Sequence, residues 1–174
     1  MTARTIGVAI GIPDPWAAEL DRSRRGSGDP LAALIPPHVT LLGPTVVHDP
    51  DAVLAHLRGV AARHAPFPLH LRGTGTFRPV TDVVFVAVAT GHAECELLEK
   101  DIRTGPLGRD LRYPYHPHVT VAHDVGVERL DEAYERLSGF DARFRVDRFT
   151  VFEHGTDGRW RPWQDFPFPD VDRG

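Results

Sequence analysis

The tetrapeptide Pro-His-Val-Thr occurs twice in this chain, at positions 37–40 and 117–120, in a sequence without low-complexity segments. Side chains two residues apart in a β-strand project to the same face of the sheet. Each copy would therefore present a histidine and a threonine side by side and turn its valine toward the core. An imidazole and a hydroxyl on each of two facing surfaces would suit acid–base chemistry on a phosphate group.

The two histidines of these copies, His38 and His118, are the candidate catalytic pair. Histidine titrates near a pH of about 6.5, so one neutral ring can accept a proton from an attacking hydroxyl or water. The other ring, protonated, can donate a proton to the leaving oxygen; the residues do not say which ring is the base. Thr40 and Thr120 are candidate phosphate ligands, because a hydroxyl can donate to non-bridging oxygens. In-line displacement needs the imidazoles on opposite sides of phosphorus, which two symmetry-related strands would provide.

The elements expected around the two copies follow one order: helix, histidine strand, helix, strand, strand. A buried strand at 5–12 comes first, followed by a helix at 15–25, a strand at 38–42, a helix that begins after Asp49 or Asp51, and strands at 67–77 and 82–89. The second series has a helix at 92–102, a strand at 118–122, a helix at 127–137, and strands at 144–152 and 159–166 joined by a hairpin turn at Asp157-Gly158. On the first helix, near-helical spacing is shared by Trp16, Ala17, Leu20 and Arg24.

This order predicts an α+β, bilobal, duplicated fold, with two antiparallel sheets flanked by helices around a central cleft and an approximate two-fold axis. No linker is long enough to separate independent domains, so residues 1–174 are expected to form one domain with approximate repeats at 14–90 and 91–168.

The bulk composition narrows the functional classes. With 41% hydrophobic and 25% charged residues the chain is an ordinary globular sequence, and its net charge of −4 argues against a sequence-independent nucleic-acid binder. The single cysteine, Cys95, excludes an internal disulfide and a cysteine-based zinc site. The sequence has no secretory signal and no membrane span, so we expect a cytoplasmic monomer.

The remaining candidates cluster around the second copy. Tyr115 and Arg112, in the loop before it, could hold a base or phosphate by stacking and charge, as could Arg109 and Tyr113 in the same loop. A metal bridging His116 and His118 is disfavoured because no carboxylate falls nearby on that face, and we predict neither a metal nor a cofactor. Phe77 could line the cleft or lie in the core, and the core is the preferred prediction, while Trp160 and Trp163 are expected to pack the terminal hairpin.

Paired His-x-Thr motifs in a duplicated bilobal chain resemble the 2H phosphoesterases. The similarity is greatest to their bacterial RNA 2′,3′-cyclic phosphodiesterase branch, once called 2′-5′ RNA ligases. It extends over nearly the whole chain and rests on PHVTLLG, FPLHLRGTGTF, VVFVAVA, PHVTVAH and the closing FTVFEHGTDGRWRPWQDFPF. The resemblance implies opening of a 2′,3′-cyclic phosphate to a 2′-phosphomonoester without a metal, and also implies possible reversible 2′–5′ ligation. If the roles of the family's motif residues apply to this chain, His38 and His118 would be the acid–base pair, and Thr40 and Thr120 would bind the phosphate.

One departure concerns His123, which stands where the RNA branch commonly has arginine after its second motif. This weakens the assignment to RNA processing more than the assignment to the superfamily, although His123 could itself contact substrate. Two alternatives stay open: a 2H-fold module that binds a phosphorylated ligand without turnover, and a phosphodiesterase acting on a small metabolite such as an ADP-ribose cyclic phosphate. The expected partner is an RNA end or a nucleotide cyclic phosphate.

Overall fold

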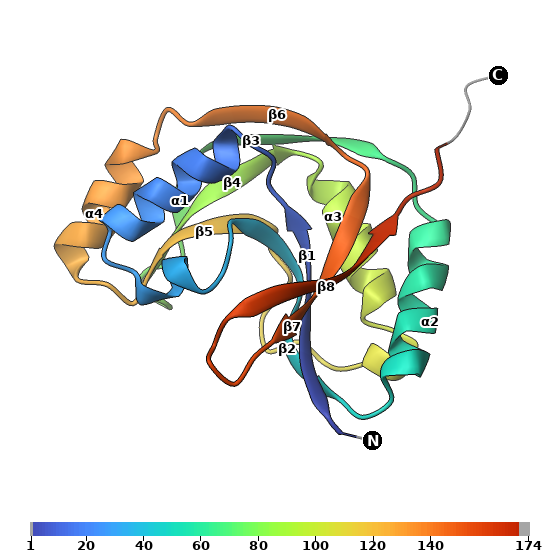
Figure 1. Cartoon of the computed structure of the whole chain (residues 1–174). Helices are drawn as coiled ribbons and strands as arrows, with labels where there is room; N and C mark the ends of the chain where they lie inside the picture. Colours follow the sequence, from blue (N-terminus) through green and yellow to red (C-terminus); the bar gives the residue numbers. More distant parts are fainter. Residues whose placement is uncertain (1, 171–174) are drawn as a thin grey trace.

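The β-branched, apolar runs of the sequence form two four-stranded antiparallel sheets in a computed structural model that describes residues 2–170 (Figure 1). The first sheet has the strand order β2-β1-β7-β8, and the second has the order β5-β4-β3-β6. The first sheet comprises β1 (Arg4–Gly11), β2 (His38–Val47), β7 (Arg148–His154) and β8 (Trp160–Pro167). The second comprises β3 (Phe67–Thr76), β4 (Val83–Thr90), β5 (His118–His123) and β6 (Asp141–Val146).

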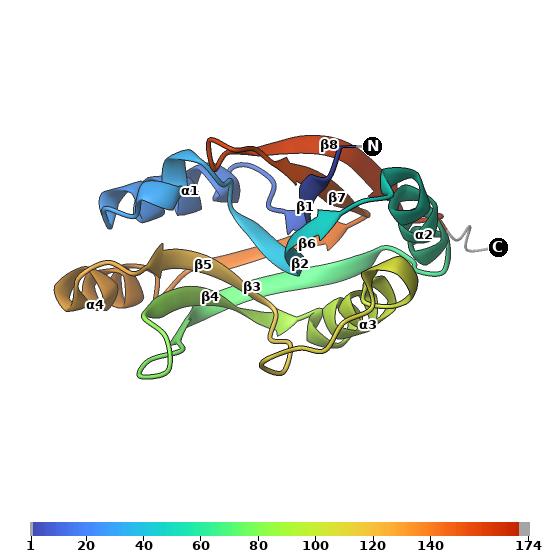
Figure 2. The ribbon, with the colours of Figure 1, turned by 90° about the horizontal axis from the view of Figure 1, so that it is seen from below.

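Four α-helices flank the sheets, which lie one over the other in Figure 2. The helices are α1 (Trp16–Gly26), α2 (Pro50–Ala62), α3 (His92–Ile102) and α4 (Val127–Arg136), with short 3-10 turns η1 (Pro30–Ala33) and η2 (Gly105–Leu107). Helices α1 and α4 lie at one end of the molecule, and α2 and α3 lie at the other (Figures 1 and 2). The Asp49 side chain accepts a hydrogen bond from the backbone N–H of Ala52 and caps α2, which decides between the two candidates Asp49 and Asp51 that the sequence offered. None of the helices within residues 2–170 is long and apolar enough to cross a membrane.

The predicted α+β duplicated fold is confirmed, and the strand order adds an exchange of strands between the halves. The strand that follows α2, β3, leaves the first sheet and pairs with β4 and β6 in the second. Correspondingly, β7, from the second half of the chain, pairs with β1 in the first sheet. Both sheets therefore contain strands from both halves of the sequence, while the repeat bounds 14–90 and 91–168 stay a prediction.

A single strand at 144–152 was a wrong prediction. The segment divides at Asp147: Val146 ends β6, opposite Phe67 in the second sheet, and Arg148 begins β7, opposite Pro167 in the first. The apolar alternation is interrupted there, because Val146 and Phe149 are buried while Asp147 and Arg148 between them are exposed. A local pattern reports which side chains are buried and does not report which sheet buries them.

The two histidine strands, β2 and β5, are each the edge strand of their sheet, and they contact one another. Val39 on β2 and Val119 and Val121 on β5 are fully buried in the core. With each valine turned inward, the alternation of a strand directs the histidine and threonine of each motif outward, toward the line along which the two sheets meet.

Candidate active site

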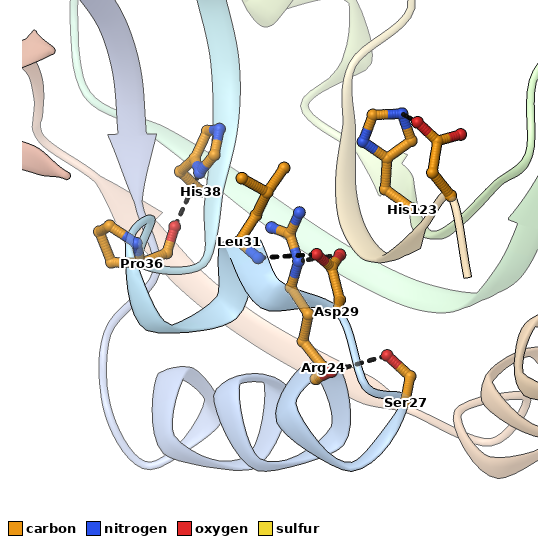
Figure 3. Close-up of polar contacts among 8 residues, drawn as sticks. Arg24, Ser27, Asp29, Leu31, Pro36, His38 and His123 are labelled. Atoms are coloured by element: carbon orange, nitrogen blue, oxygen red, sulfur yellow. Dashed lines mark hydrogen bonds and ion pairs between the residues drawn. The ribbon is translucent and has the colours of Figure 1, made fainter. Parts of the chain in front are cut away.

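The ring of His38 is held by hydrogen bonds on both nitrogens. Its Nδ1 lies 2.7 Å from the backbone oxygen of Pro36, and its Nε2 lies 3.0 Å from the hydroxyl of Thr40 (Figure 3 shows the contact with Pro36). A carbonyl oxygen can only accept, so Nδ1 carries the proton and the neutral ring keeps its lone pair on Nε2. That lone pair accepts from Thr40, which leaves Nε2 as the basic atom of this motif.

The ring of His118 is anchored in the same manner. Its Nδ1 donates to the backbone oxygen of His116 over 2.7 Å, again two residues earlier in the chain. No hydrogen bond joins its Nε2 to any of residues 2–170, so the lone pair of this ring is available. Phe77 meets the ring edge-on at 4.9 Å between centroids, and Phe85 lies at 5.2 Å. The second imidazole thus lies in an aromatic surround.

The backbone around the two motifs is duplicated in detail. Positions 38–43 and 118–123 have the same succession of buried and half-buried residues. Each strand also carries a bulge at the same place: the partners on the neighbouring strand shift by one residue after Thr40 in β2 and after Thr120 in β5. Because of this bulge, residue 43 in β2 and residue 123 in β5 lie on the same half-buried face as the histidine and threonine of their motif.

Both motif histidines have a lowered pKa. Burial out of water disfavours the charged ring and is the largest cause for His38, whose pKa falls to about 4, with further lowering by the positive charges of Arg24 and of protonated His118. Burial also lowers the pKa of His118, and the neighbouring His116 adds to the effect. Both rings are therefore neutral at pH 7 in the free protein, and a positive charge on His118 would lower the pKa of His38 further.

Tyr115 joins the two halves of the site. Its hydroxyl donates to the backbone oxygen of Thr40 over 2.7 Å, and burial raises the pKa of the phenol, so it remains a donor. Its ring lines a pocket of about 420 Å³ together with residues of both motifs. The lining comprises Thr40, Phe77, Val80, Thr81, Leu111, Tyr113, Pro114, Tyr115, His116 and His118. The volume falls in the range of small-molecule sites, and the aromatic lining suits a flat base.

The other predicted binding residues do not line the pocket of about 420 Å³. Arg112 is exposed and stacks its guanidinium on the Tyr113 ring at 5.2 Å, outside the set of pocket-lining residues. His123 is 38% exposed in its side chain, and its Nε2 lies 3.2 Å from the carboxylate of Asp124. Thr120 shares the face of His118, but it does not line the pocket and its hydroxyl has no hydrogen bond within residues 2–170. The binding roles of these three residues stay predictions.

Two aromatic residues make site contacts that the sequence did not indicate. Phe77, for which the core was the preferred prediction, lines the pocket and contacts His118. Trp160 packs on Phe152 and His154 of the terminal hairpin, as predicted, and also lies against His38 at 4.9 Å between ring centroids. In both cases the contact depends on which strands become neighbours, and neither residue carries a local signal of it.

No group of three or more His, Cys, Asp or Glu side chains within residues 2–170 converges as a metal site would require. A larger hollow, of about 750 Å³, lies along β3 and β6 and includes His70 and Arg143. It contains neither motif, and Asp141 already occupies the Nε2 of His70 at 2.9 Å. The chemistry is therefore argued from the pocket beside His118.

Comparison with known proteins identifies the family of this chain. The family model of the 2′-5′ RNA ligase superfamily matches residues 12–158, most of the chain. The chain belongs to this superfamily. A relative from Halalkalibacterium halodurans, described as a candidate phosphoesterase, is 30% identical over 164 residues, which cover 92% of this chain and 95% of the relative.

Solved structures of the 2′-5′ RNA ligase superfamily share the fold. Escherichia coli LigT in complex with NADP+ has a TM-score of 0.65 at 21% identity, covering 96% of this chain and 99% of that chain. The same protein in complex with 3′-AMP has a TM-score of 0.64 at 21% identity, covering 97% of this chain and 100% of that chain. The resemblance to 2H phosphoesterases is thereby confirmed, and membership in the superfamily supports phosphoesterase activity.

Proposed function

We propose that this protein opens a 2′,3′-cyclic phosphate, on a nucleotide or an RNA end, to a 2′-phosphomonoester by paired-histidine catalysis without a metal. The observation that carries the proposal is the duplicated anchoring of His38 and His118. Each Nδ1 donates to a backbone oxygen two residues earlier, on adjoining edge strands, and each neutral ring keeps its Nε2 lone pair outward. Two imidazoles held alike on two facing strands suit an in-line displacement.

In the proposed reaction, one neutral imidazole removes a proton from water as the water oxygen attacks phosphorus. The bond between phosphorus and the 3′ oxygen breaks, and the other imidazole, in its protonated form, gives a proton to that oxygen. The 2′ oxygen keeps the phosphate. With a sugar hydroxyl as the nucleophile in place of water, the same steps form a 2′–5′ linkage.

The roles of the two rings differ in this proposal. The pKa of about 4 makes His38 a poor proton donor near neutral pH, and its Nε2 already accepts a hydrogen bond from Thr40. His38 is therefore assigned as the base. His118, whose Nε2 is unoccupied beside the pocket, is assigned as the acid, and the negative charge of a bound phosphate would favour its protonated form.

A second candidate function is binding of a phosphorylated nucleotide without turnover. It is favoured by the lowered pKa of both histidines, which leaves no protonated acid at neutral pH in the free protein. The pocket of about 420 Å³ also suits a mononucleotide or a small metabolite such as an ADP-ribose cyclic phosphate.

A cleavage assay in EDTA separates these candidates. Adenosine 2′,3′-cyclic phosphate, an RNA oligonucleotide ending in a 2′,3′-cyclic phosphate and an ADP-ribose cyclic phosphate are incubated with the protein, and the products are separated by chromatography. Formation of a 2′-phosphomonoester supports the phosphodiesterase, and the preferred compound identifies the substrate class. Loss of activity in EDTA, or binding of all three compounds without product, would contradict it.

A further inference from the structure

The buried ion pair between Arg24, on the last turn of α1, and Asp29 is unusual for its depth. The Arg24 side chain is 8% exposed and that of Asp29 is 0% exposed, with Nε of Arg24 at 2.8 Å from Oδ2 of Asp29. Both carboxylate oxygens of Asp29 accept a hydrogen bond, since Oδ2 accepts from Arg24 and Oδ1 accepts from the backbone N–H of Leu31 over 2.9 Å at the start of η1. An arginine is rarely buried to this extent unless its donors are matched.

Most donors of Arg24 are not matched. A guanidinium group carries five N–H donors, and Asp29 takes only the one on Nε. Within residues 2–170, neither Nη1 nor Nη2 of Arg24 forms a hydrogen bond, yet the only side-chain polar atom there that is buried without a partner is Nε1 of Trp160. The two Nη groups therefore reach an opening, although the rest of the side chain is enclosed.

The guanidinium is directed toward the two motif strands. Figure 3 shows the guanidinium of Arg24 directed away from α1, toward the space between the strands that carry His38 and His123. Helix α1 packs against β5, and the positive charge of Arg24 is one of the causes that lower the pKa of His38. The free edge of the guanidinium thus faces the region where the proposed reaction needs its phosphate.

A neighbouring arginine on the same helix shows what an ordinary ion pair looks like in this chain. Arg25 pairs with Asp21 through Nε at 2.8 Å, but both side chains are solvent-accessible and the pair links successive turns of one helix. Arg24 instead points inward from the apolar face of α1, beside the fully enclosed Asp29. The burial fixes the orientation of the guanidinium, as a preorganised anion ligand requires.

We propose that Arg24 is a phosphate-binding residue of the cleft: its two Nη groups bind non-bridging oxygens of the phosphate held between His38 and His118, and Asp29 positions the guanidinium. The proposal rests on the proposed function, because it takes the cleft as a phosphate site. It identifies a permanent positive charge that neither sequence motif contains. Two parallel N–H donors match two phosphate oxygens, which a lysine at the same place would not do.

The test compares Arg24→Gln with Arg25→Gln in the full chain. Binding of adenosine 2′-monophosphate and of inorganic phosphate is measured by calorimetry at pH 8, where both motif histidines are neutral. We expect Arg24→Gln to weaken nucleotide binding about 10- to 100-fold, the usual effect of losing hydrogen bonds to a charged group. Arg25→Gln, which removes a charge of the same sign from the same helix, should stay within about twofold of the wild type. Arg24→Lys should recover only part of the affinity.

Asp29→Asn separates a binding role from a structural one. It weakens the same buried pair but keeps the positive charge and an acceptor oxygen for Nε, so it should lower the melting temperature as Arg24→Gln does while losing only a smaller part of the nucleotide affinity, through less exact positioning of the guanidinium. Equal loss of affinity in Asp29→Asn and Arg24→Gln, in step with their loss of stability, would overturn the binding role. Arg24→Gln with affinity within about twofold of the wild type would also overturn it.

The wild type alone provides a further measurement if Arg24→Gln does not fold. A guanidinium keeps its charge, so nucleotide affinity should persist from pH 6 to pH 8.5; affinity that disappears as the imidazoles lose their protons would contradict the proposal, as would a wild type that binds neither probe. Cyclic phosphate hydrolysis that is unaffected in Arg24→Gln would refute the phosphate-binding role of Arg24 and leave the proposed function intact. Nucleotide binding that depends on Arg24, without any hydrolysis, would support the binding role of Arg24 and refute the proposed hydrolysis.

Discussion

The two Pro-His-Val-Thr motifs have the same backbone and different surroundings. Both have the same pattern of burial, the same bulge after the threonine, and the same bond from Nδ1 to the backbone oxygen two residues earlier. At the first motif, Nε2 of His38 accepts from Thr40, and Trp160 lies against the ring. At the second, Nε2 of His118 has no partner within residues 2–170.

The difference separates what the motif itself fixes from what the rest of the chain supplies. The tetrapeptide in an edge strand sets the position and tautomer of each imidazole, since both bonds that do this are local. Protonation depends mainly on burial by the surrounding fold, which is the largest cause of the lowered pKa of both rings; the charge of Arg24 adds to it at His38 and that of His116 adds to it at His118. Two nearly identical strands can therefore provide one base and one acid.

The comparison is tested most strongly by removing each imidazole in turn. His38→Ala and His118→Ala should each lower kcat/KM for adenosine 2′,3′-cyclic phosphate by about 10²- to 10⁴-fold, because each removes one positioned proton-transfer group. The double variant should lose less than the product of the two single losses, since the rings act on one reaction coordinate. Initial rates in EDTA provide the measurement.

The matched control for both variants is His70→Ala. His70 is bonded to Asp141 on the second sheet, away from the motifs, so its loss should leave kcat/KM nearly unchanged. Full activity in either motif variant would remove that imidazole from the mechanism. A strongly impaired His70→Ala would show that the losses report general disturbance of the fold.

The sequence predicted the elements and motif strands well because their signals are local. The helix at 92–102 has its predicted bounds in α3, and both His-Val-Thr segments lie on strands with their valines buried. The division at Asp147 was missed because pairing with one sheet or the other is a long-range property. The break in apolar alternation at Asp147-Arg148 was a local signal of the division, but it does not indicate which strands pair on either side of it.

The site was predictable to the extent that it lies in the motifs. Arg24 was not recognised, although a signal existed: it shares helical spacing with Trp16 and Leu20, so a charged residue stands on the face that packs inward. Phe77 was assigned to the core because a phenylalanine in a strand is usually buried, and only the fold brings it to His118. Arginine burial and ring contacts of this kind depend on tertiary neighbours.

The lowered pKa of the motif histidines predicts an acid-sensitive fold. The pKa of His38 is about 4 in the folded protein and about 6.5 when unfolded, so between these values the unfolded chain binds more protons. Stability is therefore full above pH 6.5 and is lost as the pH falls through 4. The expected loss from His38 between pH 7 and pH 4 is about 2–3 kcal/mol, measured by urea unfolding.

The variant His38→Gln isolates this contribution. It removes the titrating ring, so its free energy of unfolding should change less between pH 7 and pH 4 than that of the wild type. His118, whose pKa is also lowered, acts in the same direction and should account for part of the remaining dependence. Identical pH dependence in the wild type and His38→Gln would show that the ring is not held neutral in the fold.

The smallest expected effect concerns the side-chain hydrogen bond that ties Tyr115, in the loop before the second motif, to Thr40 of the first motif. Tyr115→Phe removes the donor to the backbone oxygen of Thr40 and should lower the free energy of unfolding by about 0.5–1.5 kcal/mol. Because this bond holds Thr40 relative to His118 across the pocket, kcat/KM should fall several-fold while both imidazoles stay intact.

Tyr113→Phe is the matched control, since Tyr113 lines the same pocket but its hydroxyl has no hydrogen bond within residues 2–170. Equal effects of the two changes would mean that the halves of the site are aligned by the packing of β2 against β5 and do not need the tyrosine.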